Sequence, residues 1–371
     1  MTADQLKAPP TSEANRTRGA EEDHGGPSFD VNFRSVGFFI LFVAGIAAGL
    51  LFVLPEITSL DQTWRRIEEG NPWWLSLCLL FTLGMFAGYV TLFQSVFVRG
   101  QSNITWRESY QITMASLAAT RLFSAGGAGG IVLTAWALKR SGMDARTVAD
   151  RSISFLVLQY LIYKIAIVVC GYGLRYGIFP GNAPFSVTVV PATLALVITI
   201  LGLSVALVPT DFERRLRGFA LRKGRIGRLA QRLANGPAAA SAGMRDALSH
   251  VRHERDPAVA GAVLYWGFQI AVLWSAFHAF GEPPPLAVVV MAFFLGMLGN
   301  LLPLPGGIGG VDGGMIGAFV AFGVSGSLAF VAVLVYRGFT FWLPTIPGVI
   351  AYLQLRKTVD RWRTTPLNYT N

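Results

Sequence analysis

Charged residues and cysteines are both scarce in this chain. Only 14% of its 371 residues are Asp, Glu, Lys or Arg, whereas a soluble domain carries about 25%. The two cysteines, Cys78 and Cys170, both lie in apolar runs, where a free thiol behaves as a small hydrophobic group. The composition therefore argues against a soluble domain, a disulfide framework and a cysteine-based metal site.

The usual signatures of enzymes and nucleotide-binding proteins are missing as well. Of the four histidines, only His278 lies inside the apolar body, so no Ser–His–Asp set can be recognised. His250 and His253 have neither cysteines nor a cluster of acids nearby to complete a metal site. No Walker A sequence is present, and the glycine runs do not match G-x-G-x-x-G after a strand. We therefore expect no catalytic residue, no cofactor and no metal.

Long apolar runs are what the chain has in abundance. It is 53% hydrophobic, with a mean hydropathy of +0.49. A run of about 20 apolar residues is long enough to cross a bilayer as a helix. We predict spanning helices at about 35–55, 72–97, 152–176, 185–208, 258–280 and 326–353. The expected fold class is therefore all-α, a polytopic membrane protein with about six spans.

Two further apolar regions, 108–138 and 285–324, are each interrupted by a glycine cluster. Glycine and proline disfavour a helix interior, and each half is too short to span. We interpret both regions as re-entrant helical hairpins; a kinked span or a pair of tight spans is the alternative. Broken backbone at membrane depth often marks the substrate site of a transporter. The predicted hinges are Gly126, Gly127, Gly129 and Gly130 in the first cluster, and Pro303, Pro305, Gly306, Gly307, Gly309 and Gly310 in the second.

Lys and Arg are distributed unevenly among the connecting segments, which predicts orientation in the membrane. The segment 209–257 holds eleven basic residues against five acidic ones, whereas 177–184 and 281–285 hold no basic residue. The segments predicted to be cytoplasmic are 98–107, 139–151, 209–257 and the tail 358–371. With this topology the first hairpin enters from inside and the second from outside, so the two form an inverted repeat.

The domain organisation follows from the same pattern. Residues 1–34 are polar and predict a disordered tail, and 35–357 predict one transmembrane domain whose halves are joined by the basic loop 209–257. The formal net charge of +10 is concentrated in cytoplasmic segments, where anionic lipid head groups are the expected partner. We therefore expect the cytoplasmic membrane as the location and no nucleic-acid partner; the pattern leaves the oligomeric state open.

Ionisable residues inside the apolar body are the remaining candidates, because each is costly there and usually functional. Arg121 precedes the first glycine cluster, Asp312 follows the second, and Arg337 lies in the last predicted span. In the functional interpretation the arginines receive an anionic lipid head group. In the structural alternative Asp312 and Arg337 form a salt bridge that only holds the hairpin in place. Asn300 either binds a head group or satisfies a carbonyl freed by the break.

The run from Asn300 to Gly348, with its Pro-x-Pro-Gly-Gly-x-Gly core, resembles the lysylphosphatidylglycerol synthase transmembrane region, or flippase-like domain. The resemblance covers about 35–357 and is specific only in this C-terminal motif. The resemblance implies that the prolines and glycines of the second cluster, and Arg337, have the same roles as the corresponding residues of the family. Asp312 stands where the family usually has Glu, and the first glycine cluster lacks the usual proline. We expect no aminoacyl-transferase domain, since few residues follow 357, so only translocation carries over from the resemblance.

The sequence thus predicts a lipid translocase without enzymatic activity. It would move an anionic or polyprenyl-linked lipid head group between the two hairpins, with Arg121 and Arg337 receiving the phosphate. The alternative is a non-catalytic membrane scaffold that partners a glycosyltransferase or lipid-modifying enzyme. Neither the lipid, nor the direction of movement, nor an energy source follows from the sequence.

Overall fold

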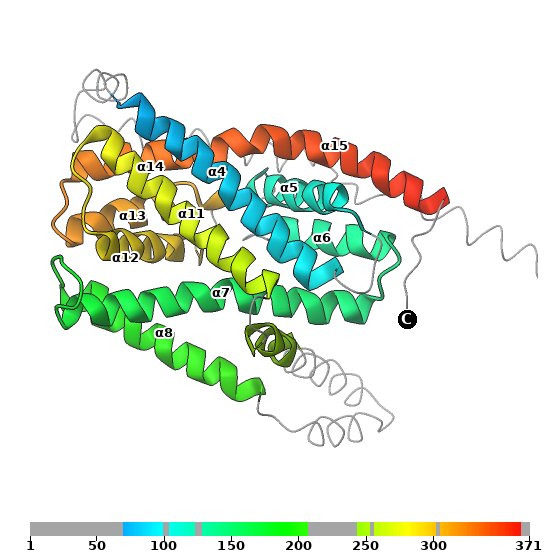
Figure 1. The fold of residues 1–371 in the computed structure, drawn as a ribbon, viewed down its shortest axis with the longest axis horizontal. Coiled ribbons are helices and arrows are strands. Elements are labelled where there is room, and N and C mark those ends of the chain that lie inside the picture. The colour runs from blue at the N-terminus through cyan, green and yellow to red at the C-terminus, as the bar shows by residue number, and fades with distance from the viewer. Residues whose placement is uncertain are drawn as a thin grey trace, which may run out of the picture. The chain divides into compact units, whose positions relative to one another are not determined.

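The structure is a computed structural model of the chain, and it describes residues 70–98, 104–122, 128–206, 243–252, 256–301 and 305–364. The described residues form helices and no strand, which confirms the predicted fold class (Figure 1). The predicted tail 1–34, the predicted span 35–55 and most of the basic loop lie outside the described residues.

Five helices are long and apolar enough to cross a membrane, and they match the five predicted spans from residue 72 onward. They are α4 (Pro72–Phe93) with the π-helix η1 (Gln94–Val98), α7 (Ala145–Arg175), α8 (Phe185–Ala206), α11 (Pro257–Phe280), and α14 (Gly326–Arg337) continued by the π-helix η4 (Gly338–Trp342) and α15 (Leu343–Thr364). The last helix runs past the predicted boundary at 357. Its end is packed rather than free, because Val359 and Trp362 are buried.

Local sequence explains where these helices begin. The side chains of Asn71, Asp144 and Asp256 each accept a hydrogen bond from a backbone N–H of the first turn, as N-cap residues do. Proline follows the cap directly in α4 and α11, at a position where its missing N–H costs nothing.

Two pairs of shorter helices are separated at the glycine clusters. The first pair is α5 (Trp106–Leu122) and α6 (Ala128–Arg140); the second is α12 (Leu286–Met297) with the 3₁₀ turns η2 (Leu298–Leu301) and η3 (Pro305–Gly307), followed by α13 (Gly310–Ala321). In Figure 1 both pairs turn midway along the long helices, and they open toward opposite ends. This arrangement fits the predicted hairpins. That each hairpin enters and leaves the membrane on the same side, and that the two form an inverted repeat, stay predictions.

The first break is shorter than predicted. Gly129 and Gly130 belong to α6, whereas Gly126 and Gly127 lie outside the described residues. A Cβ at Gly130 would lie 2.6 Å from the Ser116 carbonyl oxygen of α5. Gly130 is therefore needed for close packing of the two helices rather than for a bend.

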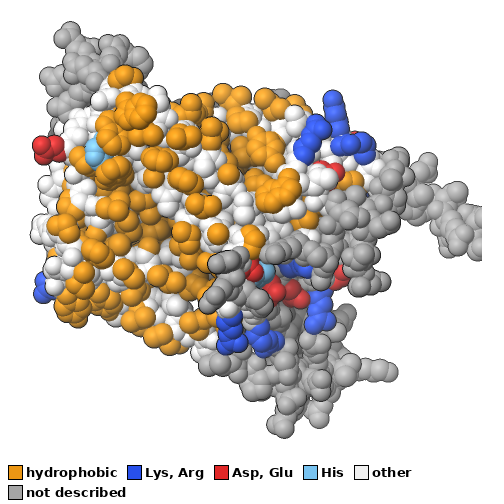
Figure 2. Space-filling model, in the orientation of Figure 1, with side chains coloured by type: hydrophobic (Ala, Val, Ile, Leu, Met, Phe, Trp, Pro, Cys, Tyr) orange, Lys and Arg blue, Asp and Glu red, His pale blue; other side chains and the backbone are white. Residues whose placement is uncertain are grey.

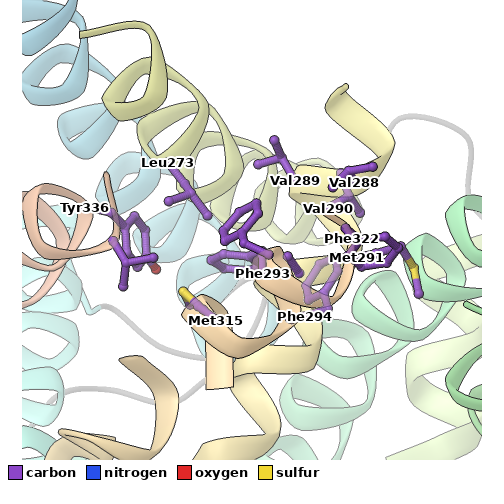
Figure 3. Close-up of a cluster of buried hydrophobic side chains, with 14 of the residues drawn as sticks. Leu273, Val288, Val289, Val290, Met291, Phe293, Phe294, Met315, Phe322 and Tyr336 are labelled. Atoms are coloured by element: carbon purple, nitrogen blue, oxygen red, sulfur yellow. The ribbon is translucent and has the colours of Figure 1, made fainter. Parts of the chain in front are cut away.

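The interior of the second half is an apolar cluster around α12. Nearly every side chain of α12 is buried, including Val288, Val289, Phe293 and Phe294 (Figure 3). Lipid tails are as apolar as these side chains, so close packing rather than the hydrophobic effect holds α12 among its neighbours. A helix packed on all sides explains why its sequence carries no polar face.

The surface that Figure 2 shows is mostly hydrophobic, and the charged side chains gather toward one end of the described residues. At that end α6 finishes, α7 begins and α15 finishes (Figure 1). Exposed aliphatic side chains such as Leu83, Leu201 and Ile346 lie between the ends. An apolar band with basic groups at one end fits a membrane-spanning protein; the cytoplasmic assignment of that end stays a prediction.

Candidate functional site

The two broken pairs meet at their tips. Arg121 lies in the last turn of α5, and a Cβ at Gly306 of η3 would lie 3.5 Å from the Arg121 carbonyl oxygen. The same hypothetical Cβ would lie 2.5 Å from the ring of Phe341 in η4. The fold therefore gathers the tip of each pair and the π-helical turn of the last span at one place, which we call the tip junction.

Arg337 and Asp312 form an ion pair at the tip junction. Arg337 Nε lies 2.5 Å from Asp312 Oδ1, and the two side chains are 11% and 27% exposed. This is the salt bridge that the structural alternative predicts, and it ties α13 to the end of α14.

Asp312 also closes the N-terminus of α13. Its Oδ2 accepts a hydrogen bond of 2.8 Å from the backbone N–H of Gly309, and a carboxylate in the first helical turn is favoured by the helix dipole. The carboxylate is thus held by the helix end and by Arg337 together, so its place does not depend on either alone.

Arg121 is held by the backbone of the last span. Nη2 donates to the carbonyl of Thr340 at 2.7 Å, and Nη1 donates to the carbonyl of Phe341 at 2.9 Å. The Thr340 carbonyl is available because the residue four positions on is Pro344, which has no N–H to donate. A proline within the last span therefore creates the acceptor that positions Arg121.

Both guanidinium groups lie against the ring of Phe341. Arg337 Cζ is 4.6 Å and Arg121 Cζ is 5.1 Å from the ring centroid, which is cation–π distance. The two cations also interact electrostatically with each other. Phe341 thus brings two like charges close together, although only one carboxylate, that of Asp312, pairs with either of them within the described residues.

The second glycine cluster adopts backbone that other residues rarely take. Gly306, Gly307 and Gly309 have φ values of 58°, 67° and 82°, in the region that glycine adopts without strain. Gly310 begins α13 and Pro305 begins η3, whereas Pro303 lies outside the described residues. Asn300 is exposed, and its amide Nδ2 contacts Met297 Sδ at 3.5 Å, so it has no carbonyl partner among the residues that the structure describes.

The sequence missed several residues of the tip junction. Nothing in the apolar run from Gly338 to Thr345 singles out Phe341 or Pro344, because their contacts depend on α5, more than two hundred residues upstream. The structure, by contrast, marks this place: η4 contains a π-helical turn in which Leu343 N–H donates to Gly338 O, and such turns often accompany functional sites.

The fold and the tip junction define a polytopic helical membrane protein with two broken-helix pairs that meet around a cationic centre. The family model for the lysylphosphatidylglycerol synthase transmembrane region matches residues 38–348. The chain therefore belongs to this family, as its C-terminal motif predicts.

Membrane proteins of Methanothermobacter thermautotrophicus and Methanocaldococcus jannaschii are similar to the chain. A UPF0104 membrane protein of Methanothermobacter thermautotrophicus is 26% identical over 329 residues, which cover 84% of this chain and 94% of that protein. Another from the same organism is 39% identical over 90 residues, spanning 24% of this chain and 27% of that relative. One from Methanocaldococcus jannaschii is 31% identical over 101 residues, or 27% of this chain and 30% of its own length.

Proposed function

We propose that the protein moves the phosphate-bearing head group of a membrane lipid across the bilayer at the tip junction, and that Arg337 is the principal phosphate ligand. In this proposal the protein makes and breaks no covalent bond. The observation that carries it is the excess of positive charge at a site between helices that fit a membrane.

The charge argument rests on two guanidinium groups and one carboxylate. Arg121 and Arg337 share the Phe341 ring, and Asp312 neutralises only one of them. An uncompensated charge among apolar helices is costly, so binding of an anion is favoured there. A phosphodiester carries the single negative charge that balances the centre.

Arg337 is better placed than Arg121 to take that anion. Its Nη2 donates to the Gly306 carbonyl at 3.3 Å and its Nε faces Asp312, so Nη1 has no acceptor among the described residues. Arg121 instead uses Nη1 and Nη2 on the last span. We therefore assign phosphate binding to Arg337, and to Arg121 the positioning of η4 together with a share of the positive field.

Lipid movement in proteoliposomes tests the proposal. We expect the purified protein to expose fluorescent phosphatidylglycerol from the inner leaflet to a membrane-impermeant quencher, as a translocase does. Arg337→Gln should abolish this movement, and Arg337→Lys should retain part of it, because lysine keeps the charge but loses the planar fork.

Arg175→Gln is the matched control, because Arg175 is exposed at the far end of α7. It should move the lipid like the parent protein. Equal movement by Arg337→Gln and the parent protein would contradict the phosphate role. Absence of movement in the parent protein, with intact folding, would instead favour a scaffold that partners a lipid-modifying enzyme.

A further inference from the structure

A lysine lies at mid-membrane depth on α7. Lys164 is eleven residues from Arg175, the last residue of α7, and nineteen from Ala145, the first. At about 1.5 Å per residue these separations are about 16 Å and 28 Å, whereas half of the hydrocarbon core is about 15 Å thick. A lysine has a stem of four carbons, which covers less than half of the shorter distance. The ammonium of Lys164 therefore does not reach the lipid head groups at either end of α7.

The helices that pack around α7 offer Lys164 no free carboxylate. α6, α8, α11, α12 and η1 contact α7 and contain no Asp or Glu. On α7 itself the nearest acid is Asp150, fourteen residues away near the basic end. Asp246, in the helix at 243–252 that packs against the first half of α7, pairs with His250. No ion pair or hydrogen bond joins the Lys164 ammonium to another described residue, and an unpaired charge at this depth is costly.

Lys164 lies beside the seam between α7 and α8. Gly171 is seven residues further along and therefore on the same face of α7. A Cβ at Gly171 would lie 2.8 Å from the Thr188 carbonyl oxygen and 2.8 Å from Ala192 Cβ, so this face turns toward α8. Lys164, two turns away from that contact, is only partly buried. A group lying along α8 can therefore reach the ammonium.

α8 presents a nearly bare apolar surface next to this lysine. It packs almost entirely against α7, and in Figure 1 it lies outside the other labelled helices. Only 17% of its apolar stretch is buried within the described chain, against 28% to 44% in the other four spanning helices. Its exposed side chains include Leu194, Val197, Ile198 and Leu201. We call this exposed face of α8, together with Lys164, the α8 flank.

A second copy of this chain does not supply a carboxylate at that depth. Asp312 lies inside the apolar body, but it already pairs with Arg337. Asp150 and Asp360 lie near the ends of their helices. The predicted span 35–55, which lies outside the described residues, contains no Asp or Glu. An acid that meets Lys164 therefore has to come from another protein.

We propose that the α8 flank docks a transmembrane helix of a partner protein, and that a carboxylate on this helix pairs with Lys164 at the centre of the membrane. Charge and depth select this occupant. Lipid tails carry no charge, and lipid head groups do not lie at the depth of Lys164. An acid near the middle of a neighbouring helix does lie there, and pairing relieves the cost that each charge has alone. The inference is independent of the proposed function, because no residue of α7 or α8 belongs to the tip junction.

Model transmembrane peptides test the inference with the full chain in phosphatidylcholine liposomes. Each peptide is a polyleucine helix of bilayer-spanning length that carries an acceptor dye and has Glu, Gln, Leu or Lys at its central position. The donor dye is attached to Tyr176→Cys, next to the end of α7, in a background without the native cysteines. The central residue lies at the depth of Lys164 whichever way the peptide inserts. Energy transfer as a function of the peptide-to-lipid ratio measures the affinity.

We expect the Glu peptide to bind on the order of tenfold more tightly than the Gln and Leu peptides, as a polar contact between membrane helices allows. Lys164→Leu should lose this preference and keep its fold, because the substitution leaves no described residue without a partner; thermal unfolding in detergent checks the fold. Lys139→Leu is the matched control, because Lys139 is exposed in the last turn of α6. It should retain the preference.

Reversing both charges produces a gain of binding that a misfolded variant cannot show. Lys164→Glu should bind the Lys peptide and lose the preference for the Glu peptide. Equal affinity of the parent protein for the Glu and Gln peptides would overturn the inference, as would an unchanged preference in Lys164→Leu, and lipid alone would then cover the α8 flank. Energy transfer between two copies of the protein that persists in Lys164→Leu and blocks every peptide would also overturn it, with a second copy as the occupant.

Discussion

Arg337 Nε lies 2.5 Å from Asp312 Oδ1, and this pair joins the first turn of α13 to the last residue of α14. Arg121 lies against the same phenylalanine ring as Arg337 but has no carboxylate of its own within the described ranges. The ion pair is therefore both a structural link and part of a centre that keeps one positive charge. The predictions below separate these two roles.

Single neutral variants of the pair should differ in stability. Asp312→Asn leaves two adjacent guanidinium groups without a carboxylate and should cost about 3 kcal/mol. Arg337→Gln should cost less, because Asp312 keeps the Gly309 N–H and the charge of Arg121 then balances it. Thermal unfolding in detergent measures both. Equal losses of stability in the two variants would contradict the conclusion that the centre holds two guanidinium groups and one carboxylate. Arg175→Gln serves as the unchanged reference.

Arg121 and Pro344 should be energetically coupled. Arg121→Leu leaves the Thr340 carbonyl without its donor, which should cost about 1–3 kcal/mol. Adding Pro344→Ala supplies a backbone N–H that can bond to this carbonyl, so part of the loss should be recovered. Pro347→Ala is the matched control in the same helix and should not rescue. Additive effects of Arg121→Leu and Pro344→Ala in thermal unfolding would refute the coupling.

Alanine substitutions at two glycines of the second break should have unequal effects. Both positions have positive φ, so each Gly→Ala change costs about 1–2 kcal/mol in backbone strain. At Gly309 a Cβ meets no atom within 4 Å, whereas at Gly306 it would lie 2.5 Å from Phe341. We expect Gly306→Ala to impair lipid movement and lower stability further than Gly309→Ala. The opposite order would show that packing against Phe341 is unimportant.

Cysteine labelling tests the orientation of the helices. In a background without the two native cysteines, Asn182→Cys and Glu282→Cys should react with an impermeant reagent from outside the cell. Arg146→Cys and Lys357→Cys should react only after permeabilisation, because basic segments favour the cytoplasmic side. All four positions are exposed. External labelling of Arg146→Cys would mean that α5 and α6 span the membrane, which would end the inverted-repeat interpretation.

The sequence predicts the long helices well because spans are set by local composition. The predicted spans at 72–97, 185–208 and 258–280 differ from the observed helices by at most two residues. The length of the last span was underestimated, since α15 continues to Thr364 through charged residues. It does so because Thr358 and Trp362 make hydrogen bonds to α5, a contact that hydropathy does not reveal.

The tip junction was predictable only in part. Charged residues in apolar runs stand out, so the pair of Asp312 and Arg337 was a natural alternative from the outset. The carbonyl partners of Arg121 depend on contacts between distant helices.

The central claim is that Arg337 binds phosphate in addition to pairing with Asp312, and the double variant Asp312→Asn/Arg337→Gln tests it most directly. Removing both charges relieves the excess positive charge of the Asp312→Asn variant, so thermal stability in detergent should recover relative to that variant. If Arg337 receives the phosphate, the same preparation should fail to bind or move phosphatidylglycerol. Recovered stability together with full lipid binding and movement would contradict the account and leave Arg337 as a structural link alone.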